Sequence, residues 1–196
     1  MLRLSFGTAV TFAAATFWPM SWAFGSSNFI FKKNSIPKPN SNDVHHHVIP
    51  DRYRMALAAQ NIKTAGGIPL PAWSPIQSQN LMDKVGIATA ILSISSPGVH
   101  FGDDAAARYL SRECNEYCAE VISGSPSRFG AFAVLPLPDV NGSLKEAEYA
   151  LDTLKLDGVV MLASQSDGTF LGDNKYNDLL AELDKRKTVV FIHPTI

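Results

Sequence analysis

The sequence predicts an α/β protein with a parallel sheet, and three observations support this prediction. Short apolar runs alternate with longer segments of helical periodicity from residue 43 onward. The apolar runs contain β-branched residues and no charge apart from Asp43 at the start of the first run, which is typical of strands buried on both faces. The helical segments are long enough to connect parallel neighbours, which need a crossover. We therefore expect about five βα units.

The expected elements follow one another in a regular order. Strands are predicted at 43–49, 87–94, 129–135, 158–162 and 188–192, helices at 51–59, 75–85, 103–122, 143–155 and 173–186, and a Gly/Pro-rich loop at 64–71. Two of the helix starts have a clear chemical signal. Ser74 and Pro75 provide an N-cap and a first-position proline, with Gln77 three residues after the cap. Ser143 and Glu146 form a capping box that predicts a helix start at Ser143.

Two architectures use this alternation, the open doubly wound sheet and the (β/α)8 barrel. A doubly wound sheet that binds dinucleotides usually has a G-x-G-x-x-G loop after its first strand, and this sequence contains none. The composition excludes further classes of protein. Lys and Arg (17) nearly balance Asp and Glu (18), so the formal net charge of −1 argues against binding nucleic acid or a membrane surface through bulk charge. A hydrophobic content of 46% excludes wholesale disorder.

Residues 1–23 have the pattern of a secretory signal peptide. Arg3 provides a positive start, an apolar stretch rich in Ala and Phe follows, and Ser21-Trp22-Ala23 supplies small residues for cleavage. We therefore expect a secreted protein, with an uncleaved membrane anchor or a misassigned start of a cytoplasmic protein as the alternatives. Contact with a membrane is expected only if this leader stays uncleaved. Residues 24–42 are rich in Ser, Asn and Pro and predict a linker to a domain at 43–196.

Four of the five histidines fall in or at the ends of predicted strands. Side chains alternate across a strand, so His45 and His47 share one face while His46 points to the other. His193 ends the last strand, and the carboxyl ends of parallel strands open on one rim. Together these imidazoles could chelate one divalent cation, although a surface tract and a simple strand terminator remain alternatives on spacing alone. His100 lies in a loop without a recognisable partner, and we expect it to be solvated.

A longer series of motifs surrounds these histidines. Asp43-x-His45-x-His47 is followed by Val-Ile-Pro, and further motifs continue in order to Pro194. They are Ala72–Pro75, Leu81–Ile87, Leu92–Gly98, Arg128–Gly130, Leu135-Pro136, Gly158-Val159 and Val190–Pro194. In this order the motifs resemble the amidohydrolase-related metal enzymes, particularly the branch similar to aminocarboxymuconate-semialdehyde decarboxylase.

The resemblance implies a (β/α)8 barrel of the TIM type with one divalent metal, usually Zn²⁺, with Mn²⁺ as the alternative. It implies that His45 and His47 are the ligands from the first strand and that His193 is the ligand from the fifth. In this family an acid/base histidine and an aspartate ligand come from later strands, which we expect beyond Ile196. The catalytic and substrate-binding residues therefore stay unassigned. The chain is expected to be the N-terminal part of the family's domain, an incomplete barrel of about five βα units.

The activity implied by the resemblance is that of a metal-dependent carboxy-lyase, which removes CO₂ from an unsaturated or aromatic carboxylic acid. Thr195 stands where the muconate enzyme has a tryptophan, and residues 64–71 offer no arginine for a carboxylate. The Ser93–Gly98 passage and the loop before Trp73 look more like the aromatic-acid decarboxylases. A hydrolase of lactones or amides from the same superfamily and a truncated inactive fragment are the alternatives. We expect a small carboxylic acid as the partner, no nucleic acid, and a homo-oligomer if unpaired sheet edges associate.

Overall fold

The computed structural model describes residues 41–65 and 67–195. The expected leader at 1–23 lies outside the described residues, as does the expected linker up to residue 40. The first strand already begins at Ser41, two residues before the predicted start of the domain. Over the part of the chain that is described, none of the helices has the length and apolar character needed to cross a membrane.

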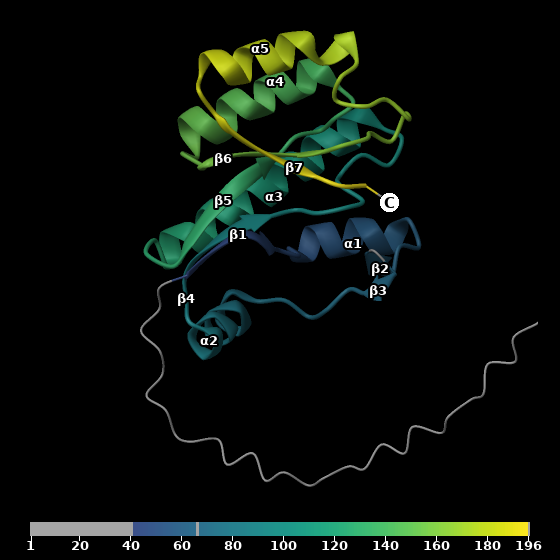
Figure 1. Ribbon diagram of the computed structural model, residues 1–196. Helices are drawn as coiled ribbons and strands as arrows, with labels where there is room; N and C mark the ends of the chain where they lie inside the picture. Colours follow the sequence, from purple (N-terminus) through teal and green to yellow (C-terminus); the bar gives the residue numbers. More distant parts are fainter. Residues whose placement is uncertain (1–40, 66, 196) are drawn as a thin grey trace, which may run out of the picture. The chain divides into compact units, whose positions relative to one another are not determined.

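A parallel sheet forms the centre of the described chain (Figure 1). Its five strands are β1 (Ser41–His47), β4 (Ile87–Ser93), β5 (Phe129–Val134), β6 (Gly158–Leu162) and β7 (Val189–His193). Every neighbouring pair is parallel. The spatial order β1-β4-β5-β6-β7 follows the order along the chain, without the reversal that marks a doubly wound sheet. This order decides between the two architectures in favour of the barrel.

The sheet is strongly curled. His45 on β1 stacks on Phe191 on β7 with ring centroids 4.7 Å apart, although these strands lie at opposite edges of the sheet. In a flat sheet, four strand spacings would separate the two strands by roughly 19 Å. Phe132 on β5 also stacks on Phe191, with ring centroids 5.9 Å apart. The concave face is therefore the interior of a partial (β/α) barrel, as predicted.

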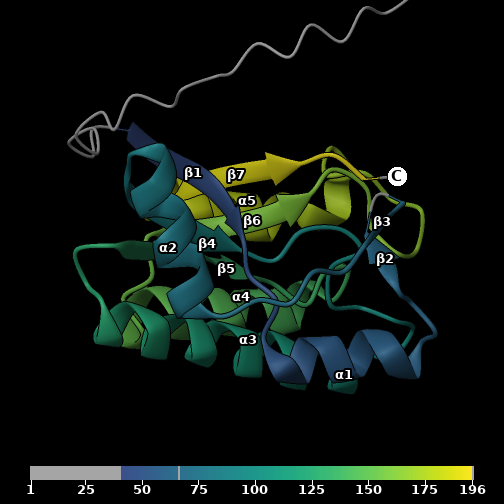
Figure 2. The same cartoon turned by 90° about the horizontal axis from the view of Figure 1, so that it is seen from below.

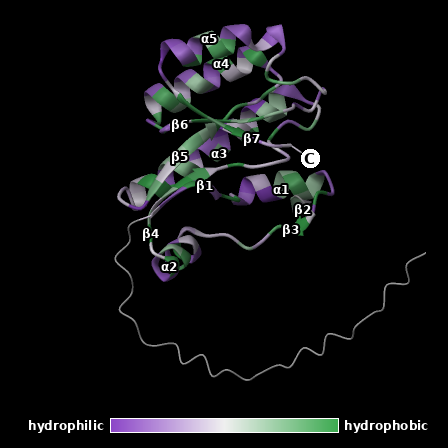
Figure 3. Ribbon diagram, in the orientation of Figure 1, coloured by the Kyte–Doolittle hydropathy of each residue, from purple (hydrophilic) through white to green (hydrophobic). Residues whose placement is uncertain are grey.

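Helices cover the sheet on its outer side (Figures 1 and 2). They are α1 (Asp51–Ala59), α2 (Pro75–Val85), α3 (Asp104–Gly124), α4 (Val140–Glu148) and α5 (Asn177–Lys185), and a short 3₁₀ turn at Asn174–Tyr176 precedes α5. Helix α2 packs against β4, α3 packs against β5, and α4 packs against both α3 and α5. In Figure 3 the central strands are hydrophobic, whereas α4 and α5 contain both hydrophilic and hydrophobic residues, as expected for helices with one face on a sheet.

The ends of α2 follow the local signals in the sequence. The Ser74 hydroxyl accepts a hydrogen bond from the backbone N–H of Gln77 at 3.2 Å, and Pro75 occupies the first helical position. Gly86 ends the helix with a φ of 81°, a left-handed conformation that favours glycine. Both the start and the end of this helix are as predicted.

The predicted start of α4 at Ser143 is wrong. The helix begins at Val140, where the Asp139 carboxylate accepts a hydrogen bond from the N–H of Gly142 at 3.0 Å. Arg108 forms an ion pair with the same carboxylate and holds it in place. Ser143 lies inside the helix and is fully buried. A charged cap with an ion-pair partner is a stronger acceptor than a serine hydroxyl, so it determines where the helix begins.

The predicted loop at 64–71 contains a small antiparallel hairpin of two strands, β2 (Thr64–Ala65) and β3 (Ile68–Pro69). The Arg54 guanidinium on α1 donates a hydrogen bond to the Pro71 carbonyl oxygen at 2.6 Å. This bond ties the end of the hairpin to α1. The hairpin thus has a defined position beside the carboxyl end of β1.

The centre and the edges of the sheet differ in burial. Every residue of β5 is buried, as are the first four residues of β6. Strands β1 and β7 each pair on one side only within the described residues. On these edges Val44, Val189 and Ile192 are more than half exposed, at 59%, 56% and 58%. The edge strands are therefore the least covered part of the sheet, and they contain the predicted metal ligands.

Candidate metal centre

His45, His47 and His193 meet at the carboxyl ends of β1 and β7, and we refer to them as the histidine cluster. One ring nitrogen of each residue lies within 4.8 Å of the others. The Nε2 atoms of His45 and His47 are 2.8 Å apart and share a hydrogen bond. The ring centroids of His45 and His193 are 4.8 Å apart. The structure thus brings together the three histidines that the sequence predicts as ligands.

An irregularity in β1 accompanies the cluster. Asp43 pairs with Ala90 and His46 pairs with Leu92, so β1 advances three residues where β4 advances two. The Asp43 carboxylate accepts a hydrogen bond from the backbone N–H of His45 at 3.1 Å. This extra residue is a β-bulge, a feature that often re-aims side chains near functional sites. The two β1 histidines of the cluster point to the same face, as strand alternation predicts.

His46 points away from the cluster, also as predicted. Its Nδ1 donates a hydrogen bond to the Asp43 carboxylate at 2.9 Å, and its Nε2 accepts one from the Ser78 hydroxyl at 3.0 Å. Ser78 is a buried residue of α2. His46 therefore joins β1 to the helix on the outer side of the sheet.

Hydrogen bonds at Nδ1 orient two rings of the cluster. His45 Nδ1 shares a hydrogen bond of 2.8 Å with the hydroxyl of Ser93, a buried residue at the end of β4. His193 Nδ1 donates to the Pro194 carbonyl oxygen at 2.5 Å. Both bonds leave Nε2 available on the cluster side of the ring. Metal-ligating histidines are commonly oriented in this way by a partner at the other nitrogen.

Burial and mutual repulsion keep the β1 histidines of the cluster neutral. Burial lowers the pKa of His45 to about 4, and repulsion from His47 and His193 contributes in the same direction. Burial and the neighbouring His193 also lower the pKa of His47. Both rings are therefore in the neutral form at pH 7, which is the form that binds divalent metals.

An apolar cavity of about 430 Å³ adjoins the cluster. His47 and His193 line it together with side chains from the start of α1, from the β2–β3 hairpin, and from the loops that follow the hairpin and β4. Its volume lies within the range that is usual for small-molecule sites. Sequence reasoning missed this cavity, because its walls come from segments that are far apart in the chain and share no motif.

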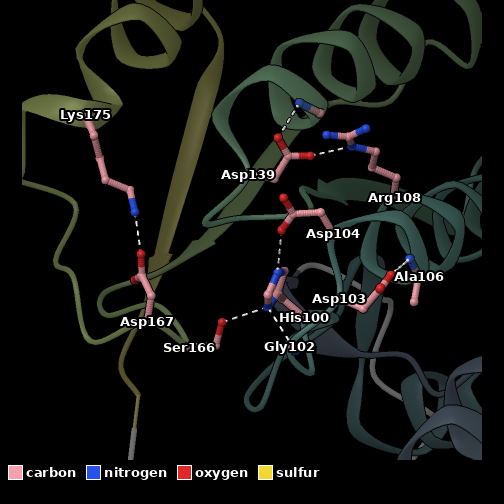
Figure 4. A network of polar contacts seen from close by, with 11 residues as sticks. His100, Gly102, Asp103, Asp104, Ala106, Arg108, Asp139, Ser166, Asp167 and Lys175 are labelled. Carbon is pink, nitrogen blue, oxygen red and sulfur yellow. Dashed lines mark hydrogen bonds and ion pairs between the residues drawn. The ribbon is translucent and has the colours of Figure 1, made fainter.

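The prediction that His100 is solvated is wrong. Its Nε2 donates a hydrogen bond to Asp104 at 2.9 Å, and its Nδ1 accepts one from the Ser166 hydroxyl at 2.8 Å (Figure 4). The His100 side chain is only 11% exposed. The ring joins the loop after β4 to the loop after β6 and to the first turn of α3. Because Ser166 is 66 residues away in the chain, no local pattern could identify it as a partner.

Comparison with known sequences identifies relatives of this chain. The Amidohydrolase family profile matches residues 42–196. The chain is 43% identical over 162 residues to Decarboxylase yanB of Aspergillus niger, covering 78% of this chain and 43% of that protein. It is 41% identical over 160 residues to 6-methylsalicylic acid decarboxylase acuB of Aspergillus aculeatus, covering 78% and 47%. The chain therefore spans less than half the length of these two relatives.

Solved structures show the same fold. The crystal structure of an amidohydrolase II is 31% identical with a TM-score of 0.76, covering 80% of this chain and 51% of that one. The structure of a dihydroxybenzoic acid decarboxylase from Polaromonas sp. is 22% identical with a TM-score of 0.63, covering 80% and 49%. The strand order and the curl of the sheet indicate a partial barrel, and the family profile matches the same residues. The chain belongs to the amidohydrolase family.

Proposed function

We propose that this protein is a metal-dependent decarboxylase of aromatic carboxylic acids, with His45, His47 and His193 as ligands of one divalent cation. The observation that carries the proposal is the convergence of these three imidazoles beside an apolar cavity. Such a site suits a flat apolar ring with a carboxylate that faces the cation. Relatives at 41% and 38% identity are named as 6-methylsalicylic acid decarboxylases, which supports the reaction.

The residues of the cluster fit a divalent cation. Three nitrogen donors lie within 4.8 Å of one another, and the Nε2 atoms of His45 and His47 are 2.8 Å apart, so His45, His47 and His193 would hold the cation. A set of imidazoles favours Zn²⁺, whereas the similar Polaromonas decarboxylase contains manganese. We therefore propose Zn²⁺ as the first candidate and Mn²⁺ as the second. When bound, the cation supplies a Lewis acid that withdraws electron density from the substrate.

The chain's own residues orient the proposed ligands and enclose the substrate. Ser93 and the Pro194 carbonyl hold the rings of His45 and His193. The apolar walls of the cavity exclude water from the aromatic ring, and an environment of this kind disfavours the charged carboxylate relative to neutral CO₂. In the reaction the bond between the ring carbon and the carboxyl carbon breaks, CO₂ leaves, and a proton takes its place on the ring. No oxidant or reductant is required.

A His193→Ala variant tests the proposal, because His193 comes from the strand farthest in sequence from β1. We expect the protein to bind Zn²⁺ or Mn²⁺ in calorimetry, and we expect the variant to lose this binding. Release of CO₂ from 6-methylsalicylate, measured on the same samples, tests the decarboxylase against the inactive fragment. His46→Ala, a change of the same residue type on β1, is the control and should still bind the metal. Unchanged metal binding by His193→Ala would contradict the ligand assignment. Hydrolysis of a lactone without release of CO₂ would favour a hydrolase.

A further inference from the structure

We propose that Thr195 is a positioning residue for the metal ligand His193, because it holds the carbonyl group that orients the His193 imidazole. The inference rests on the proposed function and goes beyond it, since it assigns a role to a residue outside the histidine cluster. The observation that carries it is a pair of hydrogen bonds between Thr195 and Ser164, a residue of the loop after β6.

The backbone of His193 depends on β6 for its position. His193 ends β7, and within the described residues this strand pairs only with β6. The His193 carbonyl oxygen accepts a hydrogen bond from the N–H of Ala163 at 2.8 Å. This bond fixes the backbone but not the rotation of the ring. The ring needs a partner of its own if its Nε2 is to point steadily into the cluster.

The partner of the ring is the next carbonyl group along the chain. The Pro194 oxygen accepts a hydrogen bond from His193 Nδ1 at 2.5 Å. The pyrrolidine ring restricts φ of Pro194, so ψ is the rotation that can still move this oxygen. The Pro194 carbonyl and the N–H of Thr195 belong to one planar peptide unit. Whatever holds Thr195 therefore also restrains the acceptor of the His193 ring.

The side chain of Thr195 is held by Ser164. Its Oγ1 accepts a hydrogen bond from the backbone N–H of Ser164 at 3.1 Å and shares a second one with the Ser164 hydroxyl. Both residues are half-buried. Because they are shielded in part from water, these bonds are stronger than they would be on an open surface. Thr195 is thus anchored through two donors or acceptors of a single residue.

Ser164 is itself part of an ordered turn. It forms an antiparallel bridge with Phe170. The side-chain amide of the next residue, Gln165, donates a hydrogen bond to the carbonyl oxygen of Leu162, the last residue of β6, at 2.7 Å. The turn is therefore fixed to the strand that pairs with β7, and so is the anchor of Thr195.

The first measurement follows the His193 ring in the metal-free full chain by ¹⁵N NMR at pH 8, where an ordinary imidazole is neutral. The bond from Nδ1 keeps the proton on that nitrogen and leaves Nε2 bare, and the ¹⁵N chemical shifts distinguish this tautomer from the other. Thr195→Val keeps the shape of the side chain but removes its oxygen, so we expect a mixture of both tautomers. Thr195→Ser retains the oxygen and should restore the original spectrum.

The second measurement is the affinity for Zn²⁺, obtained by competition with a chromophoric chelator. We expect Thr195→Val to weaken binding by about 10-fold and Thr195→Ser to stay within about threefold of the unmodified chain. Thr89→Val is the matched control and should change neither readout. Thr89 is also a half-buried threonine whose hydroxyl donates to a backbone oxygen, that of Ser127 at 3.4 Å, but it lies near the start of β4 rather than at the carboxyl end.

Each outcome decides the proposal. An unchanged tautomer or an unchanged affinity in Thr195→Val would overturn it, as would an equal effect in Thr89→Val or no recovery in Thr195→Ser. If Thr195→Val does not fold, Ser164→Ala decides, because it removes one of the two bonds and should shift both readouts in the same direction by a smaller amount. Failure of the proposed function is a separate result. If the unmodified chain binds no Zn²⁺, the ligand assignment is wrong, and the tautomer in the metal-free chain still decides the role of Thr195.

Discussion

The histidine cluster and His100 both lie at the carboxyl ends of strands, yet their nitrogen atoms are used differently. In the cluster, the Nε2 atoms of His45 and His47 face each other at 2.8 Å. At His100 both nitrogens are occupied, one by Asp104 and one by Ser166. A position on the rim therefore does not by itself make a histidine a ligand. The ring must also keep one nitrogen free of protein partners other than further ligands.

The two sites also differ in what surrounds them. The cluster joins the two edge strands β1 and β7 across the concave face, where coverage is incomplete. His100 lies beside the buried centre of the sheet and connects the loops that follow β4 and β6. We infer that the first site is arranged to bind a ligand and the second to hold loops in place.

The largest expected effect concerns the metal. The combined substitution His45→Ala and His47→Ala removes two of the three donors, so it should weaken Zn²⁺ binding by more than about 100-fold. Loss of a ligand's hydrogen-bond partner alone already costs up to about 100-fold, and loss of the ligands themselves should cost more. His100→Ala should leave the affinity within about twofold, because His100 contributes no nitrogen to the cluster. Competition with a chromophoric chelator measures both constants. Similar affinities of the two variants would remove the distinction between the sites.

Loss of the Ser93 hydroxyl should have a smaller effect on the same constant. Ser93→Ala removes the partner of His45 Nδ1, and we expect Zn²⁺ affinity to fall by about 10- to 100-fold. Ser111→Ala is the matched control, since Ser111 is also fully buried but its hydroxyl has no hydrogen-bond partner among the described residues. Urea unfolding of both variants separates orientation of the ring from a general loss of stability. An equal loss of affinity in the two variants would argue against a positioning role for Ser93.

The role of His100 in stability is the next prediction. His100→Ala leaves Asp104 and Ser166 without their shared partner, so the free energy of unfolding should fall by about 1–2 kcal/mol. Urea denaturation of the metal-free chain measures this change. An unfolding midpoint equal to that of the unmodified chain would mean that these bonds do not hold the loops.

The last prediction is a pH dependence of the metal-free chain. His45 has a pKa of about 4 in the folded chain and an ordinary value of 6.5. Between these values the unfolded chain binds a proton that the folded chain does not, so stability should decrease as pH falls from 6.5 toward about 4. Above 6.5 this residue should have no effect. Urea midpoints across this window, compared with those of His45→Gln, measure the contribution, and equal slopes for the two proteins would contradict it.

Much of this protein could be predicted from local patterns. The apolar runs correctly indicated the strands, and Ser74 and Pro75 correctly indicated the start of α2. The opposite orientations of His45 and His46 also follow from the sequence alone, because alternation along a strand is a property of the backbone. These features depend on residues only a few positions apart, and such residues are in contact whatever the rest of the chain does.

Only the tertiary structure decided the remaining features. The approach of His193 to His45 depends on the curl of the sheet, and the link from His100 to Ser166 depends on two loops meeting. The start of α4 also depends on a residue far away in the sequence, since Arg108 on α3 holds the Asp139 carboxylate that caps the helix. Each of these contacts joins residues that are separated by 31 positions or more. Strand curvature, register and loop packing determine such distances, and these properties arise from the whole sheet rather than from any one segment.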